Sequence, residues 1–347
     1  MSTAACTSTV SSVAPRPIRW GIIGCGDVVE VKSGPGFYKA RDSTLVAVMR
    51  RDAARAENFA RRHGVPRWHA DADAIIEARD IDAVYVATLP DTHLDYARRA
   101  AAAGKAVYVE KPMAMSHAEC EAMIAACDAA GVPLWVGYYR RALPRFLAVR
   151  DRIAAGVIGR VREVVSAQAQ RAPADASGAW RRDPARSGGG PFFEGAVHTL
   201  DFLDCLFGPM TIVAARATSR GDPRLEDFVE ARYRFASGVE GRGRWDFAAA
   251  GDAEYNEIIG DRGRLRFSTT RDVPIELWRG GRRESVAIAD PPHVHQPLIQ
   301  TIVDELNGRG RCPSNGVSAA RTAAVVDEVL APLRRQTGIA VPATLPR

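Results

Sequence analysis

The segment that decides the fold is IRWGIIGCG, residues 18–26, in which a short apolar run ends in the turn Gly24-Cys25-Gly26. Similar short apolar runs, each followed by a helical stretch, recur up to residue 137. We predict strands at 19–24, 45–49, 83–87, 106–109 and 133–137, and helices at 53–63, 92–103 and 116–130. Short apolar strands separated by helices are typical of a doubly wound parallel sheet with both faces covered. The sequence therefore predicts an α/β domain over residues 18–137.

From residue 138 onward the pattern changes. Segments such as VEARYRF, residues 229–235, alternate apolar and polar residues, which is typical of strands with one buried face. We expect strands near 161–170, 211–219, 227–235, 239–247, 254–260 and 263–267, and helices at 144–155, 195–207, 296–307 and 317–337. Residues 138–347 are thus predicted to form an α+β domain on a largely antiparallel, open sheet.

Composition excludes several classes of protein. No apolar run approaches the roughly 20 residues that span a membrane, and residues 1–17 lack the apolar centre of a secretory signal, so we expect a flexible tail and a cytoplasmic protein. The net charge of +6 comes from arginines interspersed with acids, without a basic stripe, which argues against nucleic-acid binding. The six cysteines form no C-x-x-C pair and no metal-type spacing, which indicates reduced thiols.

The glycine turn after the first strand predicts a dinucleotide site of the Rossmann type. One glycine permits the tight turn and the other lets the backbone approach a pyrophosphate at the next helix's N-terminus. The third glycine of G-x-G-x-x-G is replaced by Val29, so the turn alone is a weak signal. Its place at the first strand of a β-α-β series strengthens the interpretation. We expect the cofactor to lie against Gly24, Cys25, Gly26, Asp27 and Val28.

The end of the second predicted strand bears on the choice of cofactor. An acidic residue commonly stands there to accept the adenosine ribose hydroxyls, whereas this chain has Arg50 and Arg51. Two guanidinium groups could hold a 2′-phosphate, which favours NADP(H). NAD(H) stays possible, because the two arginines could be solvated and Asp52 could serve the ribose.

Two further motifs follow the third and fourth strands, at the edge where ligands bind in open α/β sheets. They are Thr88-Leu89-Pro90-Asp91-Thr92-His93 and Glu110-Lys111-Pro112. With the glycine turn, and with Gly188-Gly189-Gly190 followed by Glu194, His198 and Asp201, they make the chain resemble the glucose–fructose oxidoreductase / inositol dehydrogenase / MocA family. The resemblance runs from about Ile18 to the last predicted helix.

That resemblance implies roles for the residues of these motifs. Lys111 is expected to transfer the proton of the reacting hydroxyl or to bind it. Thr88, Leu89, Pro90, His93, Glu110 and Lys111 itself are expected at the cofactor. The chemistry agrees, because oxidation of a secondary alcohol needs hydride transfer to the nicotinamide and removal of the hydroxyl proton. A desolvated lysine has a lowered pKa and suits that task.

Glu194, His198 and Asp201 stand at i, i+4 and i+7, which predicts one face of a helix. The resemblance favours a proton relay or a substrate grip, with His198 and Glu194 catalytic and Glu194 and Asp201 at the substrate. A divalent metal site is the alternative, and we expect none. The chain departs from the family in having Glu194 for the usual Asp and Ala196 for the usual Gly, which leaves the substrate open.

Other candidate substrate ligands are Arg141, Trp180 and Arg181. Arg141 follows the fifth strand and either touches substrate or pairs with an acidic neighbour in the second domain. Trp180 could be a platform for a sugar ring or simply a packed loop residue. His293 and His295 suggest a metal only faintly and are interpreted as the approach to a helix.

Together these features predict an NAD(P)-dependent oxidoreductase acting on a secondary alcohol or ketone of a sugar or polyol. Two alternatives are open: an NAD-dependent glycosidase acting by transient oxidation and elimination, and a non-catalytic cofactor-binding regulator. The open second sheet, as in relatives of this family, predicts a homodimer or homotetramer.

Overall fold

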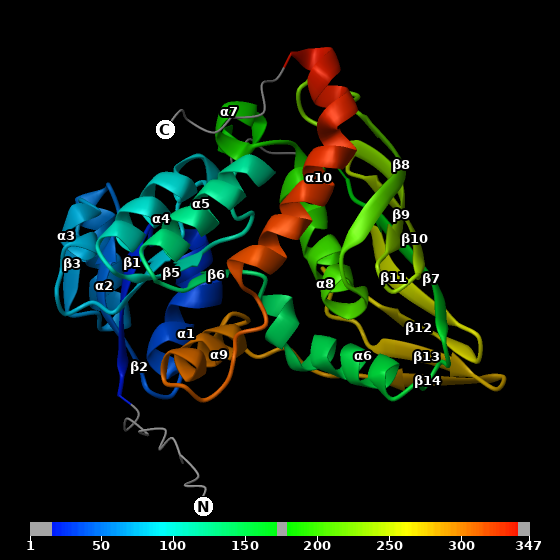
Figure 1. Cartoon of the computed structure of the whole chain (residues 1–347), viewed down its shortest axis with the longest axis horizontal. Helices are drawn as coiled ribbons and strands as arrows, with labels where there is room; N and C mark the ends of the chain where they lie inside the picture. The colour runs from blue at the N-terminus through cyan, green and yellow to red at the C-terminus, as the bar shows by residue number, and fades with distance from the viewer. Residues whose placement is uncertain (1–15, 172–178, 339–347) are drawn as a thin grey trace, which may run out of the picture.

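The computed structural model describes residues 16–171 and 179–338, and the predicted tail at residues 1–17 lies outside the described residues except for Arg16 and Pro17. Two sheets organise these residues, one parallel and one mostly antiparallel (Figure 1). The predicted fold class is therefore confirmed.

The first sheet has the strand order β3-β2-β1-β4-β5-β6, and all its neighbouring strands are parallel. Its strands are β1 (Ile18–Ile23), β2 (Ser43–Met49), β3 (Arg67–His69), β4 (Ala83–Val86), β5 (Ala106–Val109) and β6 (Leu134–Val136). This order reverses direction between β1 and β4, the point at which doubly wound sheets bind dinucleotides. The edge strand β3 was not predicted, because it has three residues and none of them is fully buried.

Helices cover this sheet and begin and end at recognisable residues. They are α1 (Gly34–Lys39), α2 (Ala53–His63), α3 (Asp73–Ile76), α4 (His93–Ala102) and α5 (His117–Ala129). The side chain of Asp52 caps α2 by accepting a hydrogen bond from the amide of Arg55, and Gly64 ends that helix with a φ of 65°. A π-helical segment, Val29–Ser33, precedes α1, and such segments are frequent at functional sites.

The second sheet has the order β14-β13-β12-β11-β7-β10-β9-β8. Its strands are β7 (Val161–Ala169), β8 (Met210–Thr218), β9 (Phe228–Phe235), β10 (Glu240–Asp246), β11 (Ala253–Gly260), β12 (Gly263–Phe267), β13 (Ile275–Arg279) and β14 (Arg282–Val286). The pairing of β7 with β10 is parallel and the other described pairings are antiparallel. The hairpin β13–β14 was not predicted, because β14 is mostly exposed and shows no apolar alternation.

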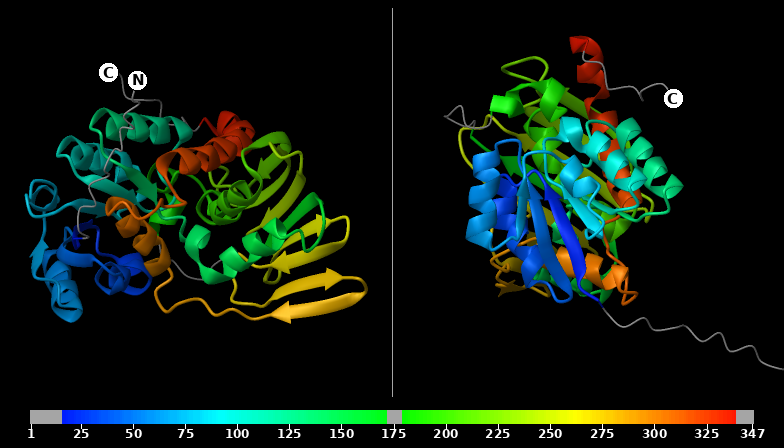
Figure 2. Two further views of the ribbon diagram at one scale, coloured as in Figure 1. Left: turned by 60° about the horizontal axis from the view of Figure 1, so that its bottom comes forward. Right: turned by 90° about the vertical axis from the view of Figure 1, so that its left-hand side faces the viewer.

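Helices lie on one face of the second sheet and leave the other face bare (Figures 1 and 2). They include α6 (Pro144–Ala154), α8 (Val197–Phe207) and α10 (Gly316–Thr337), whereas the short α7 (Pro184–Ser187) contacts residues 90–92, which follow β4. Helix α9 (Gln296–Leu306) instead returns to the first sheet and contacts α1. None of the helices in the described part of the chain is long and apolar enough to cross a membrane.

An aromatic cluster under β1, β4 and β5 determines where polar groups lie beside the site. The rings of Tyr85 and Tyr108 stack with centroids 4.6 Å apart, and Phe37 lies 5.0 Å from Tyr85. Both tyrosines are fully buried, so their hydroxyl groups need partners inside the protein. Those partners are Glu110 and His295, which places polar atoms at the carboxyl end of β5.

Candidate active site

The predicted glycine turn follows β1 directly. Gly24 has a φ of +98°, its amide donates to Met49 O at 2.9 Å, and a Cβ atom there would lie 2.8 Å from the Ala87 carbonyl. Around Gly26, by contrast, a Cβ atom would meet only Gly24 O, at 4.0 Å. The turn thus needs glycine at its first position and keeps open space at its second. The Cys25 side chain lies in the core, and burial raises its thiol pKa to about 11, so only its backbone can face a ligand.

A cleft of about 430 Å³ opens at this turn. It lies at the carboxyl ends of β1, β2, β4 and β5, and the second domain closes its far side. The residues that line it include, from the first domain, Gly24, Gly26, Asp27, Val28, Arg50, Arg51, Thr88, Leu89, Pro90, Glu110 and Lys111, and, from the second, Trp180, Arg181, Arg186, Ser187 and Glu194. A dinucleotide fits this cleft, because its walls combine a bare glycine backbone, an arginine pair and the lysine in the positions that the parallel sheet provides.

At the end of β2, the side chains of Arg50 and Arg51 lie at the cleft, whereas the side chain of Asp52 is engaged by the helix that follows. Arg50 donates to Cys25 O at 3.3 Å, so its guanidinium lies beside the glycine turn, and Arg51 is exposed at the cleft. The Asp52 carboxylate is engaged by the Arg55 amide at 3.1 Å and by the Arg55 side chain at 3.3 Å. Asp52 therefore acts as a helix cap here.

His93 does not line the cleft, contrary to its expected place at the cofactor. It is buried, with Nε2 3.1 Å from Thr88 O and Nδ1 3.1 Å from Pro112 O. The imidazole therefore bridges the segments that follow β4 and β5. Its effect on a ligand is indirect, through the position of Thr88.

Lys111 extends across the cleft toward the second domain. Its Nζ donates to Glu194 O at 3.2 Å. Burial lowers the pKa of Lys111, while the charges of Glu194 and Glu110 oppose the shift. The amine is therefore held at the junction of the two domains, next to an accessible cleft, and burial makes it easier to deprotonate than a solvated lysine.

The carboxylate of Glu110 lies beneath Lys111 and is held by several donors. Tyr85 donates to its Oε1, the Lys111 amide donates to Oε2 at 3.0 Å, and His295 Nε2 lies 3.5 Å from Oε1. His295 Nδ1 lies 3.0 Å from the Tyr108 hydroxyl, and burial lowers the pKa of His295 to about 4. A neutral imidazole thus links Tyr108 to Glu110. The sequence interpretation missed this, because His295 was assigned only to a helix approach.

Glu194 lies on a π-helical segment, Phe192–Ala196, that runs into α8. The predicted helix at 195–207 therefore starts earlier and with a different period, so spacings of four and seven residues from Glu194 do not define one face. The Glu194 carboxylate accepts from Arg181 Nε at 2.7 Å, beside Trp180, whose ring lies 4.5 Å from the Arg181 guanidinium. Buried Glu226 fixes this segment by accepting from the amides of Gly190 and Phe193 at 2.8 Å.

His198 lies in the first turn of α8, near Lys111. Its ring is 5.6 Å from that of Tyr139, and its Nδ1 is buried without a hydrogen-bond partner among the described residues. Burial, followed by the charges of Arg140 and Lys111, lowers its pKa well below the usual value. The imidazole is therefore neutral near pH 7 and has a free nitrogen.

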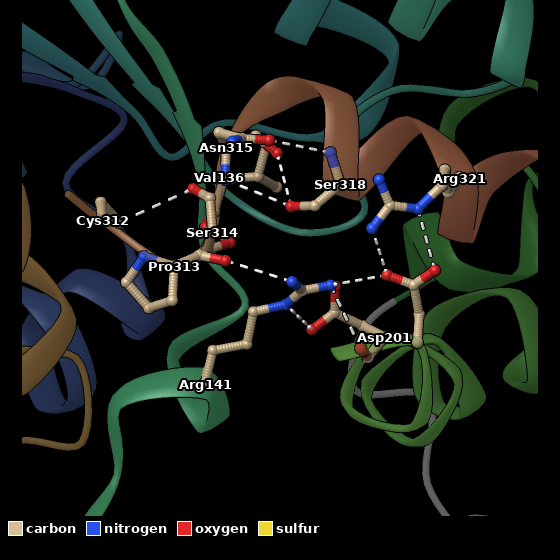
Figure 3. Close-up of polar contacts among 10 residues, drawn as sticks. Val136, Arg141, Asp201, Cys312, Pro313, Ser314, Asn315, Ser318 and Arg321 are labelled. Atoms are coloured by element: carbon tan, nitrogen blue, oxygen red, sulfur yellow. Dashed lines mark hydrogen bonds and ion pairs between the residues drawn. The ribbon is translucent and has the colours of Figure 1, made fainter. Parts of the chain in front are cut away.

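Arg141 and Asp201 do not face the cleft, contrary to their expected place at the substrate. Arg141 donates to the Asp201 carboxylate through Nε at 2.8 Å and Nη2 at 2.7 Å, and its Nη1 donates to Pro313 O at 3.1 Å (Figure 3). Asp204 accepts from Arg141 at 3.3 Å and from Arg321 at 2.6 Å. The alternative interpretation, an ion pair with an acidic neighbour, is the one found, and it joins the end of β6 to α8 and α10.

No group of three histidine, cysteine, aspartate or glutamate side chains within residues 16–171 and 179–338 is arranged to hold a metal ion. His293 Nε2 lies 3.0 Å from Lys39 Nζ, whereas His295 faces Glu110. The two histidines of the PPHVHQP segment thus have different surroundings.

The strand order, the glycine turn and the lysine-bearing cleft define a two-domain NAD(P)-dependent oxidoreductase. Comparison with known proteins gives the same class. Residues 18–138 match the oxidoreductase family with an NAD-binding Rossmann fold, and residues 146–266 match the GFO/IDH/MocA C-terminal domain. The chain belongs to the Gfo/Idh/MocA oxidoreductase family, as its motifs predicted.

Individual relatives span most of the chain. Oxidoreductase P35 of Formosa agariphila is 38% identical over 317 residues, which are 89% of this chain and 97% of that protein. Inositol 2-dehydrogenase of Rhizobium meliloti is 32% identical over 76% of this chain and 79% of its own length. Among solved structures, aldose-aldose oxidoreductase from Caulobacter crescentus, complexed with glycerol, superposes with a TM-score of 0.82 at 26% identity, covering 92% of this chain and 98% of that one.

Proposed function

We propose that this enzyme transfers a hydride between a nicotinamide cofactor and a secondary alcohol or ketone carbon of a sugar or polyol. The observation that carries the proposal is the place of Lys111. Its amine has a lowered pKa and lies in the same cleft as the glycine turn, opposite Glu194. The named activities of the inositol and aldose relatives support the substrate class.

The chain's own residues divide the remaining work. The bound nicotinamide supplies the hydride acceptor or donor. Lys111 binds the reacting hydroxyl oxygen and takes or returns its proton, because a lysine with a lowered pKa exchanges a proton more readily near neutral pH. Neutral His198, whose Nδ1 has no partner among the described residues, can accept a hydrogen bond at that nitrogen from Lys111 or the reacting hydroxyl. Once its hydrogen bond from Arg181 is broken, the Glu194 carboxylate can accept a hydrogen bond from a neighbouring substrate hydroxyl.

The test is a screen of sugars and polyols with NAD⁺ and NADP⁺ at 340 nm, using the wild type and Lys111→Met. We expect turnover by the wild type and a loss of roughly a hundredfold or more in the variant, as for a lost general base. The affinity for NADPH should change less than threefold. Lys39→Met, which removes an exposed lysine from α1, is the matched control. Unchanged turnover by Lys111→Met contradicts the proposed role.

We further propose NADP(H) as the preferred cofactor. Arg50 and Arg51 both line the cleft at the end of β2, and the Asp52 carboxylate is already engaged by Arg55. A 2′-phosphate would find two guanidinium donors there and no free carboxylate to repel it. Calorimetric titration should show NADPH binding at least tenfold tighter than NADH, and Arg51→Ala should weaken only NADPH. Tighter binding of NADH would contradict this preference.

We propose a homodimer or homotetramer in which a second copy covers the bare face of the second sheet. This face carries Val165, Ala167 and Ala215 among paired charges, and Val213 is 56% exposed at its edge. Apolar side chains on an uncovered sheet indicate an interaction surface. Sedimentation equilibrium should show an oligomer that Val165→Glu shifts toward monomer. A monomeric wild type contradicts the proposal.

A further inference from the structure

Three arginines near the start of the second domain are buried, and they differ in their partners. Arg140, Arg141 and Arg145 are 8%, 6% and 4% exposed. Arg141 pairs with Asp201 and Asp204, and Arg145 pairs with Asp290 at 2.9 Å. Arg140 makes no ion pair with the described residues.

The hydrogen bonds of Arg140 are also incomplete. Its Nε donates to Thr269 O at 2.6 Å, and its Nη1 is buried without a partner among the described residues. Burying an unpaired charge is costly, and burial lowers the pKa of Arg140 below its ordinary value. The two neighbouring arginines show that this fold supplies carboxylates where a buried guanidinium has only a structural role. Arg140 therefore has a free donor edge that the protein itself leaves unmatched.

Arg140 belongs to the cluster around Lys111. Its guanidinium lies 4.9 Å from the Tyr139 ring, and that ring lies 5.6 Å from His198 and 4.4 Å from His295. The charges of Arg140 and Lys32 both act on Lys111 and on His198. Basic groups thus converge behind the lysine that the proposed reaction uses.

The acidic groups of this neighbourhood are already engaged. Glu110 is held by Tyr85 and the Lys111 amide, and Glu194 accepts from Arg181. Glu254 and Asp290 also act on Arg140, but Glu254 accepts from the Thr269 amide and hydroxyl, and Asp290 pairs with Arg145. The exposed Lys32 has no ion pair with a described residue either. Around Arg140, the hydrogen-bond donors without a partner therefore outnumber the acceptors without one.

We infer that the substrate carries a carboxylate, as an aldonate or a uronate does, and that Arg140 binds it while Lys111 binds the reacting hydroxyl. This inference rests on the proposed function and narrows its substrate class. With Nε committed to Thr269, the guanidinium presents Nη1 and Nη2 as one planar edge, which matches the two oxygens of a carboxylate. A terminal phosphate has three oxygens and finds only this one buried guanidinium.

The experiment compares acid and neutral members of matched pairs: D-gluconate with D-sorbitol, D-glucuronate with D-glucose, and D-galacturonate with D-galactose. For the wild type we expect kcat/KM to be at least tenfold higher for an acid than for its neutral partner. Arg140→Gln should remove that preference, mainly by raising the KM for the acids. Arg140→Lys should retain part of the preference. Arg150→Gln, which removes an exposed charge from α6, should change neither value.

A binding measurement makes the result independent of turnover. D-gluconate and inorganic phosphate are titrated separately into NADP⁺-loaded wild type and Arg140→Gln, with the melting temperature of each protein as a check on folding. Tenfold weaker gluconate binding by the variant supports the inference. Turnover of neutral sugars without acid preference overturns the inference and leaves the proposed function intact, as does phosphate binding tighter than gluconate. Binding of gluconate unchanged by the substitution also overturns it.

Discussion

Replacing Asp201 with asparagine separates a structural role from a substrate-binding role. The Asp201 side chain is 1% exposed, and its two oxygens accept from Arg141 at 2.7 and 2.8 Å. Burial alone would lower the pKa of Arg141, but the charge of Asp201 and the hydrogen bonds to it raise that pKa above its ordinary value. The carboxylate therefore holds a cation that could not otherwise stay buried.

The size of the effect follows from what stays behind. Removing one partner of a buried ion pair costs roughly 3–5 kcal/mol, because the other charge is left uncompensated. Asp204 would still accept from Arg141 at 3.3 Å, and asparagine leaves no cavity, so we expect the lower end, about 3 kcal/mol. The neutral amide of asparagine has only one acceptor oxygen, so it cannot accept from both nitrogens that now donate to Asp201.

Urea unfolding followed by tryptophan fluorescence measures this loss, and steady-state kinetics measures its effect on catalysis. Asp151→Asn, at an exposed residue of α6 that pairs with Arg150, should cost less than about 0.5 kcal/mol and serves as the control. The KM of Asp201→Asn should stay within threefold of the wild-type value. An unchanged unfolding midpoint together with a tenfold higher KM would refute the structural assignment.

Two further predictions concern His295 and the glycine turn at residues 24–26. Burial lowers the pKa of His295 to about 4 in the fold, against about 6.5 in the unfolded chain, so the unfolded chain binds the extra proton between these values. The free energy of unfolding should therefore fall by up to about 3 kcal/mol as the pH drops from 6.5 to 4. His295→Gln should flatten this pH dependence in urea unfolding, and an unchanged pH dependence contradicts the assignment. Gly24→Ala should abolish NADPH binding measured by calorimetry, because the new Cβ would lie 2.8 Å from the Ala87 carbonyl. The control Gly64→Ala, at a φ of 65° with open space around it, should lower the free energy of unfolding by only about 1 kcal/mol and leave NADPH binding intact. Equal effects of the two substitutions on binding would contradict this account of the turn.

The sequence predicted the larger strands and helices because their signals are local. Buried strands such as Ala83–Val86 have no polar residue to obscure the pattern, and the helix at Ala53–His63 has both a capping Asp52 and a terminal Gly64. The edge strand Arg67–His69 and the hairpin β13–β14 lacked such a signal. Strands β3 and β14 bury none of their own side chains fully and are held by pairing with their neighbours, whereas β13 buries Ile275 and Leu277.

The first-domain side of the site was predicted better than the side formed by the second domain. Apart from Cys25 and His93, the predicted cofactor residues line the cleft, because the carboxyl ends of parallel strands meet at one edge. The π-helical segment at Phe192–Ala196 changed the helical period, so Glu194 and Asp201 separated. The contacts of Arg140 and His295 join segments more than a hundred residues apart, and no spacing in the sequence reports them.

The segment from Tyr139 to Arg145 connects stability to recognition. It follows the last strand of the cofactor sheet, and its buried cations meet the second domain, where Arg141 and Arg145 are neutralised by Asp201, Asp204 and Asp290. Those ion pairs fix the backbone that follows Arg140, and its Nε bond to Thr269 O orients the guanidinium, while its charge stays unmatched. A rigid unmatched donor loses little conformational entropy when a ligand arrives, and it discriminates against ligands that cannot supply an acceptor. The same two pairs that stabilise the domain junction would therefore make Arg140 selective, and loosening either pair should reduce the preference for an acidic substrate before it reduces turnover of a neutral one.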